Sequence, residues 1–242
     1  MATIYAATPD GYVYHTGDNW DNVHDATTGT SADADDSSTF FAIHTKSAAV
    51  GRTTNYYIRR AYFTFDVSDI DIAPSTATLK IYGYTDGPTG PYGDIIAIEG
   101  TFTGVGHLDT GDFDSFTGFS AGWGSGNVTA YSSELTSWSD SGYNDMALNA
   151  TALAKMASAS TLSIVLMNHD FDYSDVSPFV GRTHNNESNG LYWADNTGTG
   201  KDPKIEYTSG GYANDPLGQD MDNKESKVIG VSSEDIKRVS GA

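Results

Sequence analysis

The chain has 242 residues, of which 32 are acidic and 13 are basic, so its formal net charge is -19. Such a charge repels a phosphate backbone, and we expect no nucleic-acid partner. The sequence contains no cysteine, which excludes disulfides, thiolate metal sites and a cysteine nucleophile.

The opening residues, MATIYAATPD, carry neither the basic region nor the apolar run of a secretory signal. No stretch of about eighteen apolar residues, the length that spans a bilayer, occurs further along the chain. We therefore expect synthesis in the cytoplasm without export through the secretory pathway, and no membrane insertion.

Short β-prone segments, each bounded by Gly, Asn, Asp or Pro, follow one another along the chain. In the run YYIRRAYFTFDVSDI, every second residue from position 61 to position 67 is apolar. In ATLKIYGY, Leu79 and Ile81 alternate with Lys80 and Tyr82. Further candidate strands are residues 11–15, 40–44, 95–102, 162–168, 179–183 and 204–208. The spacing predicts an all-β protein, a two-sheet jelly-roll sandwich.

One segment, ALNATALAKMA at residues 147–157, has helical periodicity. Leu148, Ala152, Leu153 and Met156 share one face, and Asn149 precedes the helix as a candidate N-cap. We expect this short helix to close one end of the sandwich.

The composition changes at SGGY, residues 209–212, after which the chain is polar until a terminal repeat begins. We predict a jelly-roll sandwich over residues 1–208, followed by a linker and a β-prone assembly arm over residues 209–242.

The motifs TPDGYVY, RRAYFTFDVSDI and ATLKIYGY occur in this order. Their order resembles the pattern of carbohydrate-binding-module-like jelly rolls of the DNRLRE or family-96 type. Asp10 and residues 60–66, 77–82, 148–153 and 203–207 stand at the corresponding places, which cover most of residues 1–208. The resemblance implies the jelly-roll architecture. The sugar-binding residues of that family lie in variable loops, so it implies no ligand residue in this chain.

The chain ends in KVIGVSSEDIKRVSGA, in which residues 227–231 recur as residues 238–242. This repeat is similar to short segments at the ends of tail, fibre and other virion proteins of tailed bacteriophages. Each unit is too small to bury its apolar side alone, so we expect it to become ordered only against a partner. The residues that carry the match, and the predicted assembly contacts, are Lys227, Val228, Gly230, Val231, Ile236, Arg238, Val239 and Gly241.

Two acidic segments present several hard oxygen ligands of the kind that calcium prefers. They contain Asp33, Asp35 and Asp36, and Asp170, Asp172 and Asp175. Neither matches the calcium-binding loop of an EF-hand. Calcium is therefore a candidate cofactor, and the alternative interpretation is that these residues only form turns.

Four aromatic residues could supply flat rings that suit stacking against a sugar, and two of them, Trp123 and Trp193, stand in turn-like contexts. These candidate glycan-binding residues are Trp20, Tyr92, Trp123 and Trp193. The alternative is that the rings fill the core of the sandwich.

Catalytic motifs are absent from the sequence. It contains no G-x-S-x-G and no H-E-x-x-H. The six Glu form no evident pair of the kind that glycoside hydrolysis requires. We expect a protein that is not an enzyme, and a polysaccharide-degrading enzyme stays a third hypothesis because carboxylates are abundant.

These observations favour a structural protein of a tailed-phage particle, assembled in the host cytoplasm and displayed on the virion surface. Its expected partners are other virion subunits, further copies of itself and host-surface glycans. A capsid decoration protein is favoured slightly over a tail or fibre component, because one compact domain with a short arm suits a surface that needs many copies. The alternative is a stand-alone carbohydrate-binding module.

Overall fold

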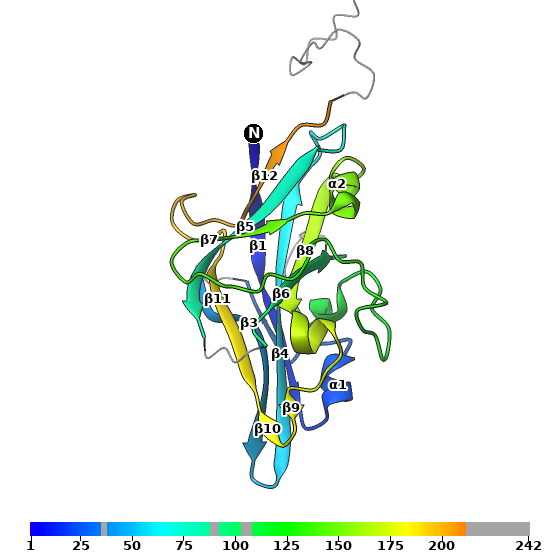
Figure 1. The fold of residues 1–242 in the computed structure, drawn as a ribbon, viewed down its shortest axis with the longest axis vertical. Coiled ribbons are helices and arrows are strands. Elements are labelled where there is room, and N and C mark those ends of the chain that lie inside the picture. Colours follow the sequence, from blue (N-terminus) through cyan, green and yellow to red (C-terminus); the bar gives the residue numbers. More distant parts are fainter. Residues whose placement is uncertain (35–37, 88–91, 103–107, 212–242) are drawn as a thin grey trace, which may run out of the picture. The chain divides into compact units, whose positions relative to one another are not determined.

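The computed structural model of the chain describes residues 1–34, 38–87, 92–102 and 108–211. Met1–Gly210 forms one compact unit, shown in Figure 1. The predicted assembly arm, apart from residues 209–211, lies outside the described residues, and so do Asp35 and Asp36.

Strands make up 47% of the described residues and helical segments 11%, which confirms the predicted all-β sandwich. The strands are β1 (Ala2–Gly17), β2 (Ser31–Asp33), β3 (Ser38–Val50), β4 (Thr53–Asp66), β5 (Thr76–Asp86), β6 (Ile95–Glu99), β7 (Tyr143–Ala147), β8 (Thr161–Asn168), β9 (Phe179–Val180), β10 (Thr183–His184), β11 (Asn186–Tyr192) and β12 (Lys204–Thr208).

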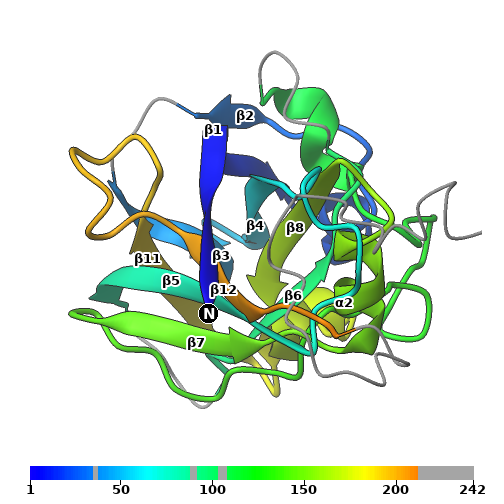
Figure 2. The ribbon, with the colours of Figure 1, turned by 90° about the horizontal axis from the view of Figure 1, so that it is seen from above.

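The main strands form two antiparallel sheets joined by two long strands that belong to both. β1 pairs with β12 over residues 2–5 and with β4 over residues 6–17. β5 pairs with β12 and β7 over residues 76–82 and continues alongside β11 over residues 83–86. In the second sheet β4 also pairs with β3 and β8, and β8 pairs with β6. Figure 2 shows β5 and β7 on one side, and β4 and β8 on the other.

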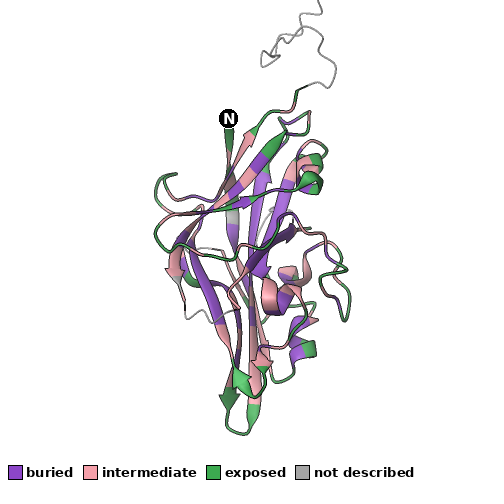
Figure 3. Ribbon diagram, viewed as in Figure 1, coloured by how far each residue is buried: buried purple, intermediate pink, exposed green. Residues whose placement is uncertain are grey.

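In the second sheet, β8 and residues 60–65 of β4 are buried on both faces. One core contains Phe63 and Phe65 of β4 together with Leu79 and Ile81 of β5. On the opposite face of β4, Tyr62 belongs to a second core that α1, η1 and η2 cover. The alternation predicted in β4 is therefore present, but residues 60–65 are buried on both sides of the strand, whereas most of its first half is not (Figure 3).

The helical segments are short. They are the α-helices α1 (Trp20–His24) and α2 (Ala150–Met156), the 3₁₀ turn η1 (Thr110–Asp114) and the π-helical turn η2 (His169–Tyr173). The helix predicted from the sequence corresponds to α2, and its predicted cap is confirmed. The Asn149 side chain accepts hydrogen bonds from the N–H groups of Thr151 and Ala152, and Ala152 and Met156 are buried in the first core.

α1 was not predicted, because five residues are too few to show a helical period. Among the described residues, no helix has the length and apolar character that crossing a membrane requires.

Candidate ligand surface and metal-ligating cluster

Trp193 lies inside the sandwich and has no exposed surface. Its indole Nε1 donates a hydrogen bond to Thr39 Oγ1 at 2.8 Å, and its ring packs against Phe63 in the first core. The ring therefore offers no face to a sugar, and the prediction of a glycan platform at this position is wrong.

Trp123 is equally buried, in the second core. Its ring stacks on that of His24, with the centroids 4.2 Å apart, and Trp20 stacks on His24 from a centroid distance of 5.3 Å. Trp20 is only 7% exposed, and its Nε1 donates to Asp175 Oδ1 at 3.1 Å. Trp20 and Trp123 brace α1 against the second sheet, so the prediction of glycan platforms is wrong for them too. Tyr92 is half-buried against Phe171, and its role in sugar binding stays a prediction.

The acidic residues of the turn after β8 point to three different places. Asp172 is fully buried and receives two hydrogen bonds from Arg60, from Nε at 2.9 Å and from Nη2 at 2.7 Å. Asp175 turns towards Trp20 and His24, whereas Asp170 turns towards Asp94. The prediction of a calcium site made of Asp170, Asp172 and Asp175 is therefore wrong. The guanidinium of Arg60 already neutralises Asp172, and the carboxylates of Asp170 and Asp175 point away from Asp172.

The other acidic segment is described only in part. Asp33 ends β2, where its carboxylate lies 3.5 Å from the hydroxyl of Tyr12. Since its partners in the predicted set lie outside the described residues, calcium binding by Asp33, Asp35 and Asp36 stays a prediction.

Asp10, which the family resemblance places at the first strand, is 1% exposed. Its Oδ2 accepts a hydrogen bond from the N–H of Ala194 at 2.9 Å and so ties β1 to the loop after β11. Its Oδ1 has no hydrogen-bond partner among the described residues. Burial raises the pKa of Asp10 to about 7, opposed by the bond from Ala194 and helped by the negative charges of Asp195 and Asp202.

A continuous row of aromatic side chains, which the sequence analysis did not single out, crosses the outer surface of four strands. We call Phe40, Tyr82, Tyr84, Tyr143 and Tyr192 the aromatic stripe. Neighbouring ring centroids lie 4.8 Å apart for Phe40 and Tyr84, 5.1 Å for Tyr84 and Tyr192, 5.7 Å for Tyr192 and Tyr82, and 5.1 Å for Tyr82 and Tyr143. Phe40 is 56% exposed and the four tyrosines are half-buried. An exposed aromatic surface of this kind is typical of a binding site.

Basic side chains lie against the tyrosines of the stripe. The Nζ of Lys201 lies 3.8 Å from the centroid of the Tyr192 ring and 5.3 Å from that of Tyr82. The Nζ of Lys204 lies 4.6 Å from the centroid of Tyr143. Lys204 Nζ also pairs with Glu206 Oε1 at 2.8 Å. The stripe therefore places aromatic rings, which suit apolar contact, beside ammonium groups that can donate hydrogen bonds to hydroxyl or carboxylate oxygens.

Part of the stripe was readable from the sequence. The alternation in ATLKIYGY already placed Tyr82 on the side opposite Leu79 and Ile81, and Tyr84 continues that side. The remaining rings come from β3, β7 and β11, which are far from β5 in sequence and meet it only through strand pairing. No local signal in the sequence predicts that these strands lie next to one another.

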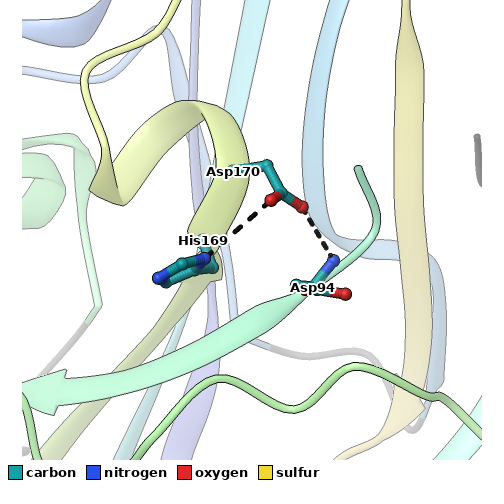
Figure 4. Close-up of side chains that lie close together, drawn as sticks. All are labelled: Asp94, His169 and Asp170. Carbon is teal, nitrogen blue, oxygen red and sulfur yellow. Dashed lines mark hydrogen bonds and ion pairs between the residues drawn. The ribbon is translucent and has the colours of Figure 1, made fainter. Parts of the chain in front are cut away.

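A second cluster joins the residue before β6 to the turn after β8 (Figure 4). We call Asp94, His169 and Asp170 the His169 cluster; one potential ligand atom from each lies within 4.8 Å of the other two. The N–H of Asp94 donates to Asp170 Oδ2 at 3.2 Å, and His169 Nδ1 lies 3.9 Å from Asp170 Oδ1. Glu134 approaches from the other side, with Oε2 at 3.9 Å from His169 Nε2. Sequence reasoning had singled out only Asp170 of these residues.

Negative charge accumulates in this cluster. Partial burial raises the pKa of Asp170, and the carboxylates of Asp94 and Glu134 raise it further, whereas the hydrogen bond from the Asp94 N–H lowers it. His169 is the one basic partner in the ion pairs of Asp170 and Glu134 among the described residues.

A pocket of about 580 Å³ opens next to the end of β6 and is lined by Glu99, Thr117 and Lys155 among others. Lys155 Nζ lies 2.9 Å from Glu99 Oε1. Burial raises the pKa of Glu99, but hydrogen bonds from Lys155 and Thr117 outweigh this, so the pKa lies below its usual value. Glu99 is the only carboxylate among the described residues that line this pocket, so the pocket does not supply the two carboxylates that glycoside hydrolysis needs.

No protein-family model matches the chain, and no curated protein sequence matches it at a significant level. The resemblance to carbohydrate-binding jelly rolls therefore rests on the three motifs named above and stays a prediction.

Proposed function

We propose that this chain is a non-enzymatic structural protein of a tailed-phage particle, in first place a capsid decoration protein and otherwise a tail or fibre component. The observation that carries the proposal is the terminal repeat of residues 227–242, which is similar to the ends of such virion proteins. A sandwich with two cores of its own, followed by a short arm, is an arrangement that suits display of a domain on a larger assembly.

Deleting residues 211–242 tests this proposal. Because Met1–Gly210 contains both cores, we expect the truncated chain to stay folded, with the same thermal unfolding temperature, and to be missing from purified particles. The double variant Val228→Ser with Val239→Ser should have the same effect, whereas Ser232→Ala with Ser233→Ala should assemble normally. Incorporation of the truncated chain at the native level would contradict the anchoring role of the arm.

The aromatic stripe favours a second function, carbohydrate binding, either by the displayed domain or by a stand-alone module. Sugar rings have apolar faces that stack on aromatic side chains, and their hydroxyl groups accept hydrogen bonds from ammonium groups. The stripe combines five linked rings with Lys201 and Lys204, and Phe40 in particular is exposed. We assign sugar binding to this surface in place of the buried tryptophans.

Alanine substitutions in the stripe test carbohydrate binding. On an array of bacterial and plant polysaccharides, we expect Phe40→Ala and Tyr192→Ala each to weaken binding roughly tenfold, with unchanged unfolding temperature for Phe40→Ala. Tyr57→Ala is the matched control, because Tyr57 is a half-buried aromatic residue outside the stripe. If all three variants bind polysaccharide as the native chain does, the stripe is not the sugar-binding site. If the native chain binds no polysaccharide, carbohydrate binding is excluded as its function.

A further inference from the structure

We propose that the His169 cluster binds one divalent transition-metal ion of the zinc class through His169 Nδ1 and the carboxylates of Asp94 and Asp170. The site is independent of the proposed assembly and sugar-binding functions. It consists of residues from two segments about seventy-five positions apart in the sequence, which strand pairing of β6 with β8 brings together.

The histidine is oriented as a ligand. Its Nδ1 is buried, has no hydrogen-bond partner among the described residues, and faces the carboxylate of Asp170 (Figure 4). Its other nitrogen, Nε2, lies 3.9 Å from the carboxylate of Glu134. Metal-binding histidines commonly direct their second ring nitrogen to a carboxylate, which holds the proton there and leaves the first nitrogen free for the metal. Glu134 lies on the side of that second nitrogen, at an ion-pair distance rather than at hydrogen-bond distance.

The charges of the cluster favour a cation. Asp94, Asp170 and Glu134 bring three carboxylates to one imidazole, and no Lys or Arg forms an ion pair with them among the described residues. Like charges held together in a partly buried place destabilise the fold unless a cation compensates for them. A divalent ion between Asp94 and Asp170 would provide that compensation.

The backbone holds the ligands in place before any ion binds. The N–H of His169 donates to the carbonyl of Asp94 at 2.7 Å, and the N–H of Asp94 donates to Asp170 Oδ2. The hydroxyl of Ser174 donates to the carbonyl of His169 at 2.8 Å, and the Tyr173 ring stacks on the imidazole with the centroids 5.3 Å apart. In a tetrahedral zinc site with bonds of about 2.1 Å, two ligand atoms are separated by about 3.4 Å. A spread of 4.8 Å therefore closes by small side-chain rotations.

The ligand set selects the class of ion. Calcium takes six to eight oxygen ligands and has little use for an imidazole nitrogen, whereas zinc, cobalt and manganese accept one nitrogen with carboxylate oxygens. Three protein ligands leave a coordination position for water. A bound ion would cross-link the residue before β6 to the turn η2 and so stabilise the folded state.

The test uses the full chain after treatment with a chelator and dialysis. We expect titration with cobalt(II), observed by calorimetry and by visible absorption, to show one ion per chain with a nitrogen-containing ligand set. Saturating zinc should raise the unfolding temperature. His169→Gln and Asp170→Asn should each abolish the one-to-one binding, and Glu134→Gln should weaken it about tenfold.

The matched control is Asp71→Asn, which removes the same charge from an exposed residue outside the cluster and should bind cobalt as the native chain does. If His169→Gln and Asp170→Asn bind cobalt like the native chain, the ions bind only loosely to an acidic surface, and the proposal is overturned. It is overturned as well if the native chain binds calcium tightly and zinc weakly, because the site would then contain oxygen ligands alone.

Discussion

Asp10 is a carboxyl group that folding moves from water into the interior, where it is 1% exposed beside two further acidic residues. Its pKa rises from 3.8 to about 7 on folding. Because the folded chain binds this proton more tightly than the unfolded chain does, the free energy of unfolding is highest below pH 4. It falls as the pH rises and Asp10 loses its proton near pH 7. We expect the free energy of unfolding of the native chain to fall over this interval by up to about 4 kcal/mol because of Asp10.

Asp10→Asn isolates this effect, because the amide keeps the size of the side chain and does not ionise. Urea denaturation at pH values from 4 to 7 gives the free energy of unfolding of the native chain and of the variant. The variant should become steadily more stable relative to the native chain as the pH rises to 7. Asp71→Asn, at an exposed position, should follow the native curve. Parallel curves for the native chain and Asp10→Asn would show that Asp10 does not cause the pH dependence.

At the scale of single residues, the sequence allowed reliable predictions only where the cause was local. Asn149 was identified as an N-cap because its bonds reach residues two and three positions ahead. Trp123 and Trp193 stand in turn-like contexts, but other segments of the chain bury them. Exposure depends on tertiary packing, and a tryptophan in a loop has the same local sequence whether its ring lies inside or outside.

The turn η2 is attached to β4 by a buried ion pair. Arg60 and Asp172 are both fully buried, and the guanidinium also donates to the carbonyl of Phe113 at 2.8 Å, so one side chain joins β4, η1 and η2. Asp172→Asn leaves the arginine charge without a counter-charge in the interior. We expect a loss of about 3–5 kcal/mol in the free energy of unfolding, measured by urea denaturation.

The matched control for that variant is Asp145→Asn, which breaks the exposed pair with Lys80 at 2.7 Å. It should cost no more than about 1 kcal/mol, because water screens an exposed pair. In addition, Arg60→Met should destabilise the Asp172→Asn background less than it destabilises the native chain. If Asp172→Asn and Asp145→Asn lower the free energy of unfolding equally, the buried ion pair does not hold η2 in place.

Among the elements, β4, β5 and helix α2 followed from periodicity, because alternation of two and of about 3.6 residues is visible in a single segment. Strands β2, β7 and β11 were not predicted. The passage of β1 and β5 from one sheet into the other was not predicted, since it depends on which strands pair with each half. The second core was missed for the same reason. The segments that build it, including α1 and η1, have no periodic pattern of their own.

At the scale of the whole molecule, we propose that a sandwich with two cores of its own carries an arm that becomes ordered on a partner. The division was predicted from the change of composition at residues 209–212, and the described compact unit is Met1–Gly210. The aromatic stripe and the His169 cluster both belong to this unit. Each of them combines residues from distant segments, which explains why only Asp170 was singled out beforehand.

The central claim is that residues 227–242 are an assembly contact of a virion protein. Imaging the native assembly that contains this chain, at a resolution that traces residues 209–242, tests it most directly. We expect the chain in a regular particle, with this segment ordered on a neighbouring subunit or on a shell protein. A monomer in which the segment packs on its own sandwich would contradict the claim, and carbohydrate binding by the aromatic stripe would then be the function to test.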